Sequence, residues 1–369
     1  MPADQSCFDK VNDSEKPPCC GPKTSICGGV VNEKVPGFLE WFSTQVGRIP
    51  RIDTRLVLPD HLGACKARWG IGRFNYIVPA GLYAIGSPRP QDPVVVTANY
   101  KMSYDIVRRA LAGRNVWLLV LETFGINVWC AAGKGTFGTD ELVRQIKETG
   151  LANVVTHRRL IMPILGATGV AAFEVTRRTG FAVNYATVRA SDLPEYLDNG
   201  MVTTTAMREL TFSLYDRLVL VPVELVHACK IIFLVGGTLF LLTSLLSGVM
   251  TGTTALLAFL GAVLTGLVIS PLLLPWLPSR SFVVKGVMAG VIWCALFYLL
   301  AGGENWSLPV TVASFLALPV ISAFYTLNFT GCTNFTSHSG VKEEMRIGIP
   351  AMGISLVGSI LLLAISRFL

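Results

Sequence analysis

The chain has 369 residues, of which 51% are hydrophobic and only 15% charged, and its formal net charge is +7. Soluble domains carry about 25% charged residues, so this composition argues against a chain that is soluble along its whole length. The basic residues form no clustered stripe of the kind that binds nucleic acid, and we expect no nucleic acid among the partners.

The first 35 residues, 1–35, are polar, contain Pro and Gly and show no periodicity, which is typical of a flexible tail. They include no apolar signal segment, so we expect the domain that follows to stay in the cytoplasm. Four of the nine cysteines lie here: Cys7, Cys19, Cys20 and Cys27. Their spacing differs from that of iron–sulfur ligands, and we expect no iron–sulfur cluster in this chain.

Residues 36–215 show the pattern of an α/β domain. A short element at 36–46 precedes a stretch rich in glycine and aromatic residues, 58–88, which predicts irregular structure with short strands. From residue 93, β-branched runs alternate with segments of helical periodicity. The predicted order is strand 93–99, helix 101–113, strand 115–123, helix 140–150 with Thr139 as N-cap, strands 153–156 and 159–166, helix 170–180 and strand 181–187.

This alternation predicts a parallel sheet in a layered α/β fold of the Rossmann or flavodoxin-like type. In such folds, ligands bind at the carboxyl ends of the strands. Three motifs fall at those ends: "TANYKMS", "NVWCAAGKG" and "GATG". We therefore expect the binding site of this domain to be built from these three segments.

Residues 231–369 form apolar blocks after an expected linker at 216–230. The blocks lie near 231–249, 254–277, 286–301, 308–328 and 348–365. Most approach the roughly 20 residues that cross a bilayer, which predicts an all-α membrane domain of five transmembrane helices.

The positions of Lys and Arg near these blocks predict their orientation. If the first domain is cytoplasmic, only Arg367 lies outside, and the inside holds Arg217, Lys230, Arg280, Lys285, Lys342 and Arg346. We therefore expect a multi-pass protein of the inner (cytoplasmic) membrane, in contact with membrane lipid, with its C-terminus outside.

The stretch "NVWCAAGKG" places one cysteine in a short predicted helix. Asn127 is a good N-cap, Val128 to Ala132 would form one or two turns, and Gly133 would supply a left-handed exit. Cys130 then lies in the first turn, where free N–H groups favour a thiolate.

Three roles remain open for this thiol on the residues alone: a nucleophile, a metal ligand, or a packed residue in a turn. No second cysteine lies nearby, so a zinc site made only of protein ligands is disfavoured. A lone thiolate suits a metal whose other ligands come from a cofactor. The flanking Trp129, Ala131 and Ala132 fit that reading, because small residues let a large planar ring approach the backbone.

Several longer segments resemble the HgcA family, the membrane-bound corrinoid proteins of bacterial and archaeal mercury methylation. They are "NVWCAAGKGTFGTDELV", "DHLGACKARWGIGR", "PAGLYAIGSP", "TANYKMSYD" and "NFTGCTNFTSHSGVKEEMR". The resemblance extends from about residue 45 to the C-terminus. The corrinoid domain of that family is in turn similar to the corrinoid-binding part of the large subunit of the corrinoid iron–sulfur protein of acetyl-CoA synthesis.

The resemblance implies a corrinoid-dependent methyltransferase with a cobalamin-type corrinoid bound base-off. The Cys130 thiolate would be the lower axial cobalt ligand and so the catalytic and metal-binding residue. The methyl group would come from methyl-folate or a methyl donor protein and would pass to Hg(II), giving methylmercury. A small ferredoxin-like iron–sulfur protein, HgcB, would be the electron donor.

The resemblance also implies cofactor contacts from five further residues: Thr97, Ser103, Val128, Trp129 and Ala190. The rest of the cysteine motif belongs to the same predicted site: Asn127, Ala131, Ala132, Gly133 and Lys134. From its glycine-rich turn, we expect a second loop of Gly166, Ala167 and Gly169 to cradle the cofactor tail.

Two alternative functions remain. The first is a corrinoid methyl carrier with an acceptor other than mercury. The second is a membrane transporter or sensor whose α/β domain binds another ligand. No charged residue lies deep inside the five apolar blocks, whereas intramembrane charges usually mark a transport pathway. The blocks therefore favour an anchor over a pump.

Overall fold

The computed structural model describes residues 35–332 and 338–366. The chain divides into an α/β unit that ends at Glu209 and a helical unit that starts at Leu210, with residues 68–71 grouped with the second. The predicted cysteine-containing tail, residues 1–35, lies outside the described residues except for Val35.

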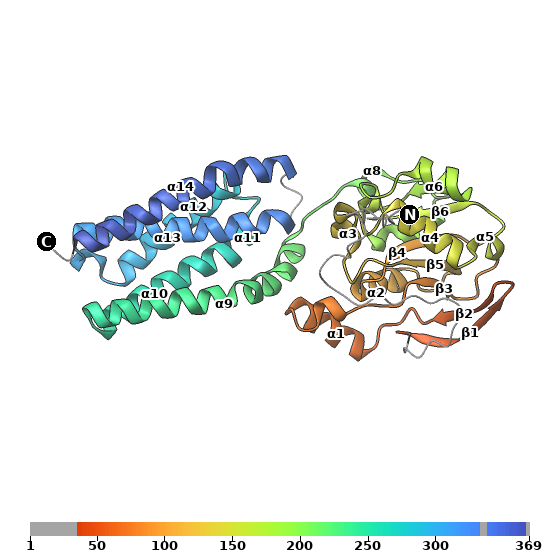
Figure 1. Ribbon diagram of the computed structural model, residues 1–369, viewed down its shortest axis with the longest axis horizontal. Coiled ribbons are helices and arrows are strands. Elements are labelled where there is room, and N and C mark those ends of the chain that lie inside the picture. The colour runs from red at the N-terminus through yellow and green to blue at the C-terminus, as the bar shows by residue number, and fades with distance from the viewer. Residues whose placement is uncertain (1–34, 333–337, 367–369) are drawn as a thin grey trace, which may run out of the picture. The chain divides into compact units, whose positions relative to one another are not determined.

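The α/β unit contains a seven-stranded sheet in the order β1-β2-β3-β5-β4-β6-β7 (Figure 1). Its strands are β1 (Phe38–Thr44), β2 (Gly47–Ile52), β3 (Gly81–Ile85), β4 (Val94–Ala98), β5 (Val116–Leu121), β6 (Arg159–Met162) and β7 (Ala182–Tyr185). The parallel pairing expected from residue 93 onward is present, because β5, β4, β6 and β7 are parallel. The sheet as a whole is mixed, since β1 pairs antiparallel with β2, and β3 antiparallel with β5.

Two physical causes make the sheet mixed. Only Gln45 and Val46 separate β1 from β2, and a connection of two residues can join only antiparallel neighbours. Strand β3 lies on the far side of β5 from β4, and its direction depends on pairing with residues more than 30 positions away. The hydrophobic pattern of the sequence does not indicate whether β3 runs parallel or antiparallel to β5.

Helices cover both faces of the sheet, because the central strands bury side chains on both sides. In β5, Trp117, Leu119 and Leu121 belong to one core, and the alternating residues Val116, Leu118 and Val120 belong to the other. The first core also contains side chains of α3 (Val128–Lys134), α4 (Thr139–Glu148), α5 (Leu151–Val154) and α6 (Ala172–Thr179). The second contains side chains of α2 (Lys101–Ala110), α7 (Leu193–Asp198) and α8 (Thr205–Arg208).

Three local predictions are corrected. Residues 153–156, expected to form a strand, form none: residues 153 and 154 end the short helix α5, which follows the left-handed Gly150 and packs Leu151 and Val154 into the core. The stretch 58–88, expected to be irregular, contains helix α1 (Leu58–Arg68). Helix α4 begins at Thr139 after the N-cap Gly138, and the Thr139 hydroxyl accepts a hydrogen bond from the Ala171 N–H at 2.9 Å instead of capping α4.

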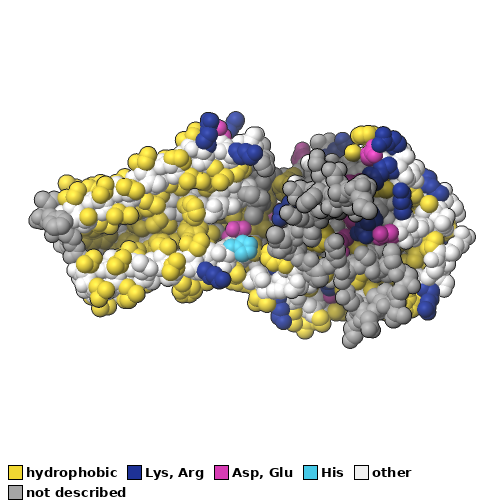
Figure 2. All heavy atoms as spheres, in the orientation of Figure 1, with side chains coloured by type: hydrophobic (Ala, Val, Ile, Leu, Met, Phe, Trp, Pro, Cys, Tyr) yellow, Lys and Arg dark blue, Asp and Glu magenta, His cyan; other side chains and the backbone are white. Residues whose placement is uncertain are grey.

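The second unit consists of long apolar helices. They are α9 (Leu214–Ser247), α10 (Val249–Leu264), which runs through a π-helical turn (Thr265–Ile269) into α11 (Ser270–Leu273), then α12 (Phe282–Leu300), α13 (Leu308–Asn328) and α14 (His338–Ile365). Within the described residues, five helical segments are long and apolar enough to cross a membrane, as predicted. Figure 2 shows hydrophobic side chains spread over the visible face of these helices.

The expected linker, residues 216–230, is helical and forms the first half of α9. A capping box starts this helix: the Ser213 hydroxyl accepts from the Asp216 N–H, and the Asp216 carboxylate accepts from the Ser213 N–H. The apolar pattern predicts only the part of α9 after Lys230, because charged residues such as Asp216, Arg217 and Glu224 interrupt the apolar run before it.

Candidate functional site

A cavity of about 270 Å³ opens at the carboxyl ends of β4 and β6. Helix α2, the start of α3 and residues 187–193 enclose it. The lining is mostly apolar and consists of Val95, Val96, Thr97, Ser103, Ile106, Val107, Asn127, Val128, Trp129, Ile161, Met162, Pro163, Leu165, Thr187, Val188, Ala190 and Leu193. The site therefore lies where parallel strands end, at the edge that the sequence predicted.

One buried polar atom in this lining lacks a hydrogen-bond partner. Thr97, near the end of β4, is 1% exposed, and its Oγ1 forms no hydrogen bond. A buried polar group without a partner destabilises a fold by about 1–3 kcal/mol. Such a group in a cavity wall is accounted for if a ligand provides the missing hydrogen bond.

Helix α3 forms as the sequence predicted at its start and differs at its end. The Asn127 side chain caps it by accepting a hydrogen bond from the Cys130 N–H at 2.9 Å. The predicted exit at Gly133 is wrong: the helix continues through Lys134, and Gly135 takes the left-handed conformation with φ 80°. The helix ends after Lys134, where the N–H groups of Thr136 and Phe137 both donate to the Ala131 carbonyl and so close its last turn.

The first turn of α3 presents Cys130 at the protein surface. Gly133, one turn further along, is also exposed, and a Cβ added there would meet nothing within 4 Å. Ala131 and Ala132 are instead buried in the sheet core, so their small size serves packing. The open approach beside the thiol therefore comes from Gly133.

The described residues contain no group of three or more His, Cys, Asp or Glu side chains that could hold a metal ion. Among residues 35–332 and 338–366, the Cys130 thiol is exposed and belongs to no such group. Such a site cannot bind a metal through protein ligands alone. It is compatible with a metal that carries its own ring of ligands.

The structure brings six of the predicted site residues together in the cavity wall: Thr97, Ser103, Asn127, Val128, Trp129 and Ala190. Cys130, Gly133 and Lys134 are exposed on the same short helix without lining the cavity. The predicted loop of Gly166, Ala167 and Gly169 does not line it either. Gly166 and Gly169 pack so closely against Phe137 that an added Cβ would lie 2.6 Å from Phe137 Cε1 and 2.2 Å from the Phe137 carbonyl oxygen, respectively.

Sequence reasoning missed more than half of the lining. Strand alternation could have identified two of these residues. Val95 lies two positions before Thr97 and so faces the same side of the sheet, and Ile161 pairs with Val95 in the neighbouring strand. The segment that contributes Thr187, Val188 and Leu193 carries no comparable pattern, because it closes the cavity only through the tertiary fold.

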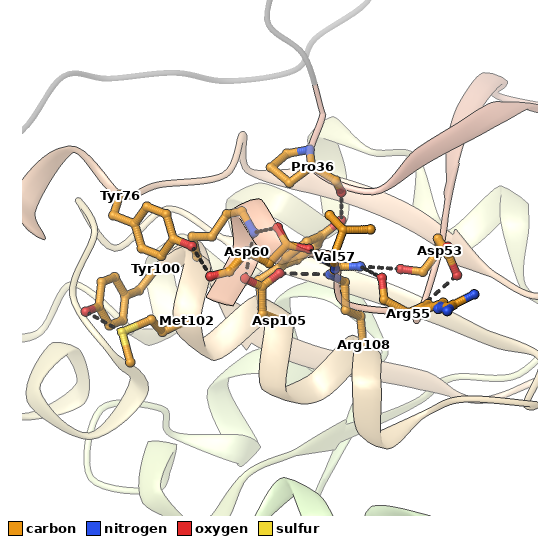
Figure 3. A network of polar contacts seen from close by, with 12 residues as sticks. Pro36, Asp53, Arg55, Val57, Asp60, Tyr76, Tyr100, Met102, Asp105 and Arg108 are labelled. Atoms are coloured by element: carbon orange, nitrogen blue, oxygen red, sulfur yellow. Dashed lines mark hydrogen bonds and ion pairs between the residues drawn. The ribbon is translucent and has the colours of Figure 1, made fainter. Parts of the chain in front are cut away.

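A buried ion cluster supports helix α2, which provides Ser103, Ile106 and Val107 to the cavity (Figure 3). Lys101 Nζ contacts Asp60 at 2.7 Å and Asp105 at 2.6 Å. Arg108, whose side chain is fully buried, contacts the same two carboxylates at 2.7 and 2.8 Å. The Arg108 guanidinium also donates to the carbonyls of Asp53 and Arg55, so the cluster ties α1 and the segment before it to α2.

The cluster keeps Asp60 charged. Burial acts to raise the pKa of Asp60, but the hydrogen bonds from Lys101 and the Val57 N–H and the charges of Lys101 and Arg108 outweigh it and hold that pKa below its usual range. The carboxylate of Asp60 is thus a fixed anchor for α2 near neutral pH.

Comparison with known proteins places the cavity inside a recognised segment. Residues 73–196 match the family described as CO dehydrogenase/acetyl-CoA synthase delta subunit. The chain is 35% identical over 123 residues to the acetyl-CoA decarbonylase/synthase complex subunit gamma of Methanopyrus kandleri, covering 33% of this chain and 26% of that subunit. For the same subunit of Methanocaldococcus jannaschii the identity is 32% over 124 residues, covering 33% and 25%.

These matches confirm the expected similarity to a protein of acetyl-CoA synthesis. The family match runs from before β3 into α7, contains every residue that lines the cavity and leaves out the helical unit. The aligned part spans about a quarter of the length of the two relatives.

Proposed function

We propose that this protein is a membrane-anchored, corrinoid-dependent methyltransferase that transfers a methyl group to Hg(II), with the Cys130 thiolate as the lower cobalt ligand. One observation carries the proposal: a cavity with an unpartnered Thr97 hydroxyl lies beside a capped helix that presents a single exposed thiol. The match to acetyl-CoA decarbonylase/synthase subunits supports it, because the sequence motifs resemble corrinoid proteins related to that system.

The residues present fit a corrinoid better than a bare metal ion. A corrin ring supplies four nitrogen ligands to cobalt, so the protein needs to add only one donor, and Cys130 is such a donor. Gly133 leaves the approach to the thiol open. Asn127 fixes the turn that carries both residues.

The apolar cavity would hold a projecting part of the same cofactor. At about 270 Å³ it suits the base that a base-off corrinoid releases from cobalt. Thr97 would donate the hydrogen bond that its hydroxyl lacks, and Ser103, Val128, Trp129 and Ala190 would complete the wall.

When bound, the corrinoid supplies a cobalt centre that accepts and releases a methyl group. Cys130 would hold the cobalt through its thiolate, an electron-rich soft donor that would suit transfer to a soft acceptor such as Hg(II). The methyl donor would be methyl-folate or a methyl donor protein. A ferredoxin-like iron–sulfur protein of the HgcB type would return electrons after each transfer.

The absorbance spectrum of the purified full-length protein tests the proposal. We expect corrinoid bands and a cobalt–sulfur charge-transfer band, and a stoichiometry of one cobalt per chain. A protein that purifies without corrinoid and binds none on reconstitution would contradict it. A protein with bound corrinoid that methylates a different acceptor but not Hg(II) would support the second candidate, a methyl carrier with another acceptor.

A further inference from the structure

The turn that joins β5 to α3, residues 122–127, is held by a side chain from the neighbouring strand. Asn99 follows β4 and is fully buried. Its Oδ1 accepts three hydrogen bonds, from the Thr123 N–H at 3.0 Å, the Thr123 hydroxyl at 2.9 Å and the Gly125 N–H at 3.2 Å. The Thr123 and Gly125 N–H groups are buried with it, so replacing Asn99 by an apolar residue would leave these two donors without that acceptor, whereas the Thr123 hydroxyl would keep the Ile126 carbonyl as an acceptor.

Two carboxylates complete the clamp. Asn99 Nδ2 donates to Glu122 Oε1 at 2.6 Å, and the same oxygen accepts from the Phe124 N–H at 2.9 Å. The Glu122 N–H in turn donates to Glu141 on α4 at 2.7 Å. Three side chains therefore hold the turn: Asn99 at the end of β4, Glu122 in the turn itself and Glu141 on α4.

The clamp holds a backbone that would not adopt this shape readily. Phe124 has φ 55° and Gly125 has φ 70°, so two consecutive residues are left-handed and one of them carries a side chain. The Thr123 hydroxyl lies 2.7 Å from the Ile126 carbonyl, a second acceptor for its single proton besides Asn99, and the next residue is Asn127, the N-cap of α3.

We propose that Asn99 is a positioning residue that sets where α3 begins and thereby where Cys130 is presented. Asn99 lies at the end of β4, 24 residues before Thr123, the first residue that it holds. The last residue that it holds, Gly125, is separated from the helix cap Asn127 only by Ile126. The consequence for Cys130 rests on the proposed function, whereas the clamp itself does not depend on a cofactor.

Hydrogen exchange of the full-length chain in detergent tests the clamp without a cofactor. In Asn99→Leu we expect peptides that cover residues 122–130 to exchange about tenfold faster than in the wild type, the factor that one or two lost hydrogen bonds correspond to. Peptides from β6 and α6 should be unchanged. The control is Asn115→Leu. Asn115 lies just before β5, and its side chain accepts a hydrogen bond from the Ser87 N–H, so its loss should leave the exchange of residues 122–130 unchanged.

Asn99→Asp is the conservative variant, because it keeps the acceptor oxygen but places a carboxylate against Glu122. Glu141 and Arg144 are the other charged groups around the turn. Because Asp keeps the acceptor oxygen but lacks the Nδ2 donor, exchange of 122–130 in Asn99→Asp should fall between that of the wild type and that of Asn99→Leu. Exchange of 122–130 within twofold of the wild type in Asn99→Leu would overturn the clamp.

The link to Cys130 has its own readout. With equal corrinoid bound, Asn99→Leu should lose the cobalt–sulfur band that the wild type shows. Retention of the full band alongside faster exchange would overturn the positioning of Cys130. A wild type that shows no such band contradicts the proposed function, and the exchange result then still decides the clamp.

Discussion

At the level of single residues, the hydroxyl of Thr97 distinguishes a ligand site from an ordinary gap in packing. Thr97→Val keeps the shape of the side chain and removes the unpartnered group. We expect the free energy of unfolding of the cofactor-free protein to stay equal or rise by about 1 kcal/mol, and corrinoid affinity to fall about tenfold. Urea titration and equilibrium binding measure the two quantities.

The matched control is Thr123→Val, because Thr123 is equally buried but its hydroxyl is hydrogen-bonded to Asn99 and Ile126. That variant should lose stability. If Thr97→Val lost stability to the same extent, the Thr97 hydroxyl would have a partner within the fold, and the cavity would lose its evidence for a ligand.

Substitutions at Gly133 test helix stability and binding of the proposed cofactor separately. An added Cβ meets open space there, so Gly133→Ala should stabilise α3 by up to about 1 kcal/mol. Gly133→Leu should also fold, but its side chain fills the space beside the thiol and should lower corrinoid binding. Gly135→Ala is the control that should destabilise, because φ is 80° there. Equal corrinoid loading in Gly133→Leu and wild type would show that the cofactor does not approach this face.

At the level of elements, the ion cluster of Asp60 with Lys101, Asp105 and Arg108 joins α1 to α2, the helix that forms part of the cavity wall. Arg108→Leu would leave the carboxylates of Asp60 and Asp105 buried with one cation fewer. Removing one partner from such a cluster typically costs about 3–5 kcal/mol, and we expect a lower urea midpoint for the α/β unit. Arg177→Leu, which breaks an exposed pair with Glu174, should change the midpoint little. Equal effects of the two variants would contradict the cluster's structural role.

The same cluster predicts an acid-sensitive fold. The pKa of Asp60 is lower in the folded protein than in the unfolded chain, so its contribution to stability is present above about pH 4 and is lost as the pH falls below that value. Unfolding free energies measured from pH 7 to pH 3 should therefore fall more steeply in the wild type than in Asp60→Asn. Parallel pH curves would contradict this assignment.

Elements with strong local patterns were predicted, and those that depend on distant partners were not. The apolar run of β5 and the periodicity of α2 identified both elements from sequence. Helix α1 was missed because its buried Asp60 is satisfied by Arg108, 48 positions away, and because Gly63 interrupts its pattern. Within the site, the cap at Asn127 was predicted from residues in sequence proximity, whereas the Asn99 clamp joins segments that only the sheet brings together.

At the level of the whole molecule, buried cations lie at one end of the long apolar helices. Arg217 donates to the Leu272 carbonyl, and Lys285 donates to the Leu274 carbonyl, so both cations bond to carbonyl groups at the C-terminal end of α11. Glu344 at the start of α14 accepts from the Phe282 and Val283 N–H groups at that same end. The sequence predicted the charge asymmetry, but these contacts show why the buried cations are tolerated.

This arrangement leads us to propose an inner-membrane protein with its α/β unit in the cytoplasm and its C-terminus outside. A periplasm-active reporter fused after Leu369 should be active, and the same reporter fused after Arg346 should be inactive. A cytoplasm-active reporter should give the reverse pattern. Cytoplasmic activity after Leu369 would contradict an odd number of crossings.

Methyl transfer by Cys130→Ala tests the central claim most directly. Alanine favours helix, and the Asn127 cap bonds to the backbone of residue 130, so the variant should fold. The measurement is methylmercury formed per bound corrinoid, together with the cobalt–sulfur band, in wild type and variant loaded to equal cobalt content. We predict that the variant retains corrinoid through the cavity, loses the band and loses methyl transfer to Hg(II). Methylation at the wild-type rate by Cys130→Ala would contradict the role of this thiol as the cobalt ligand.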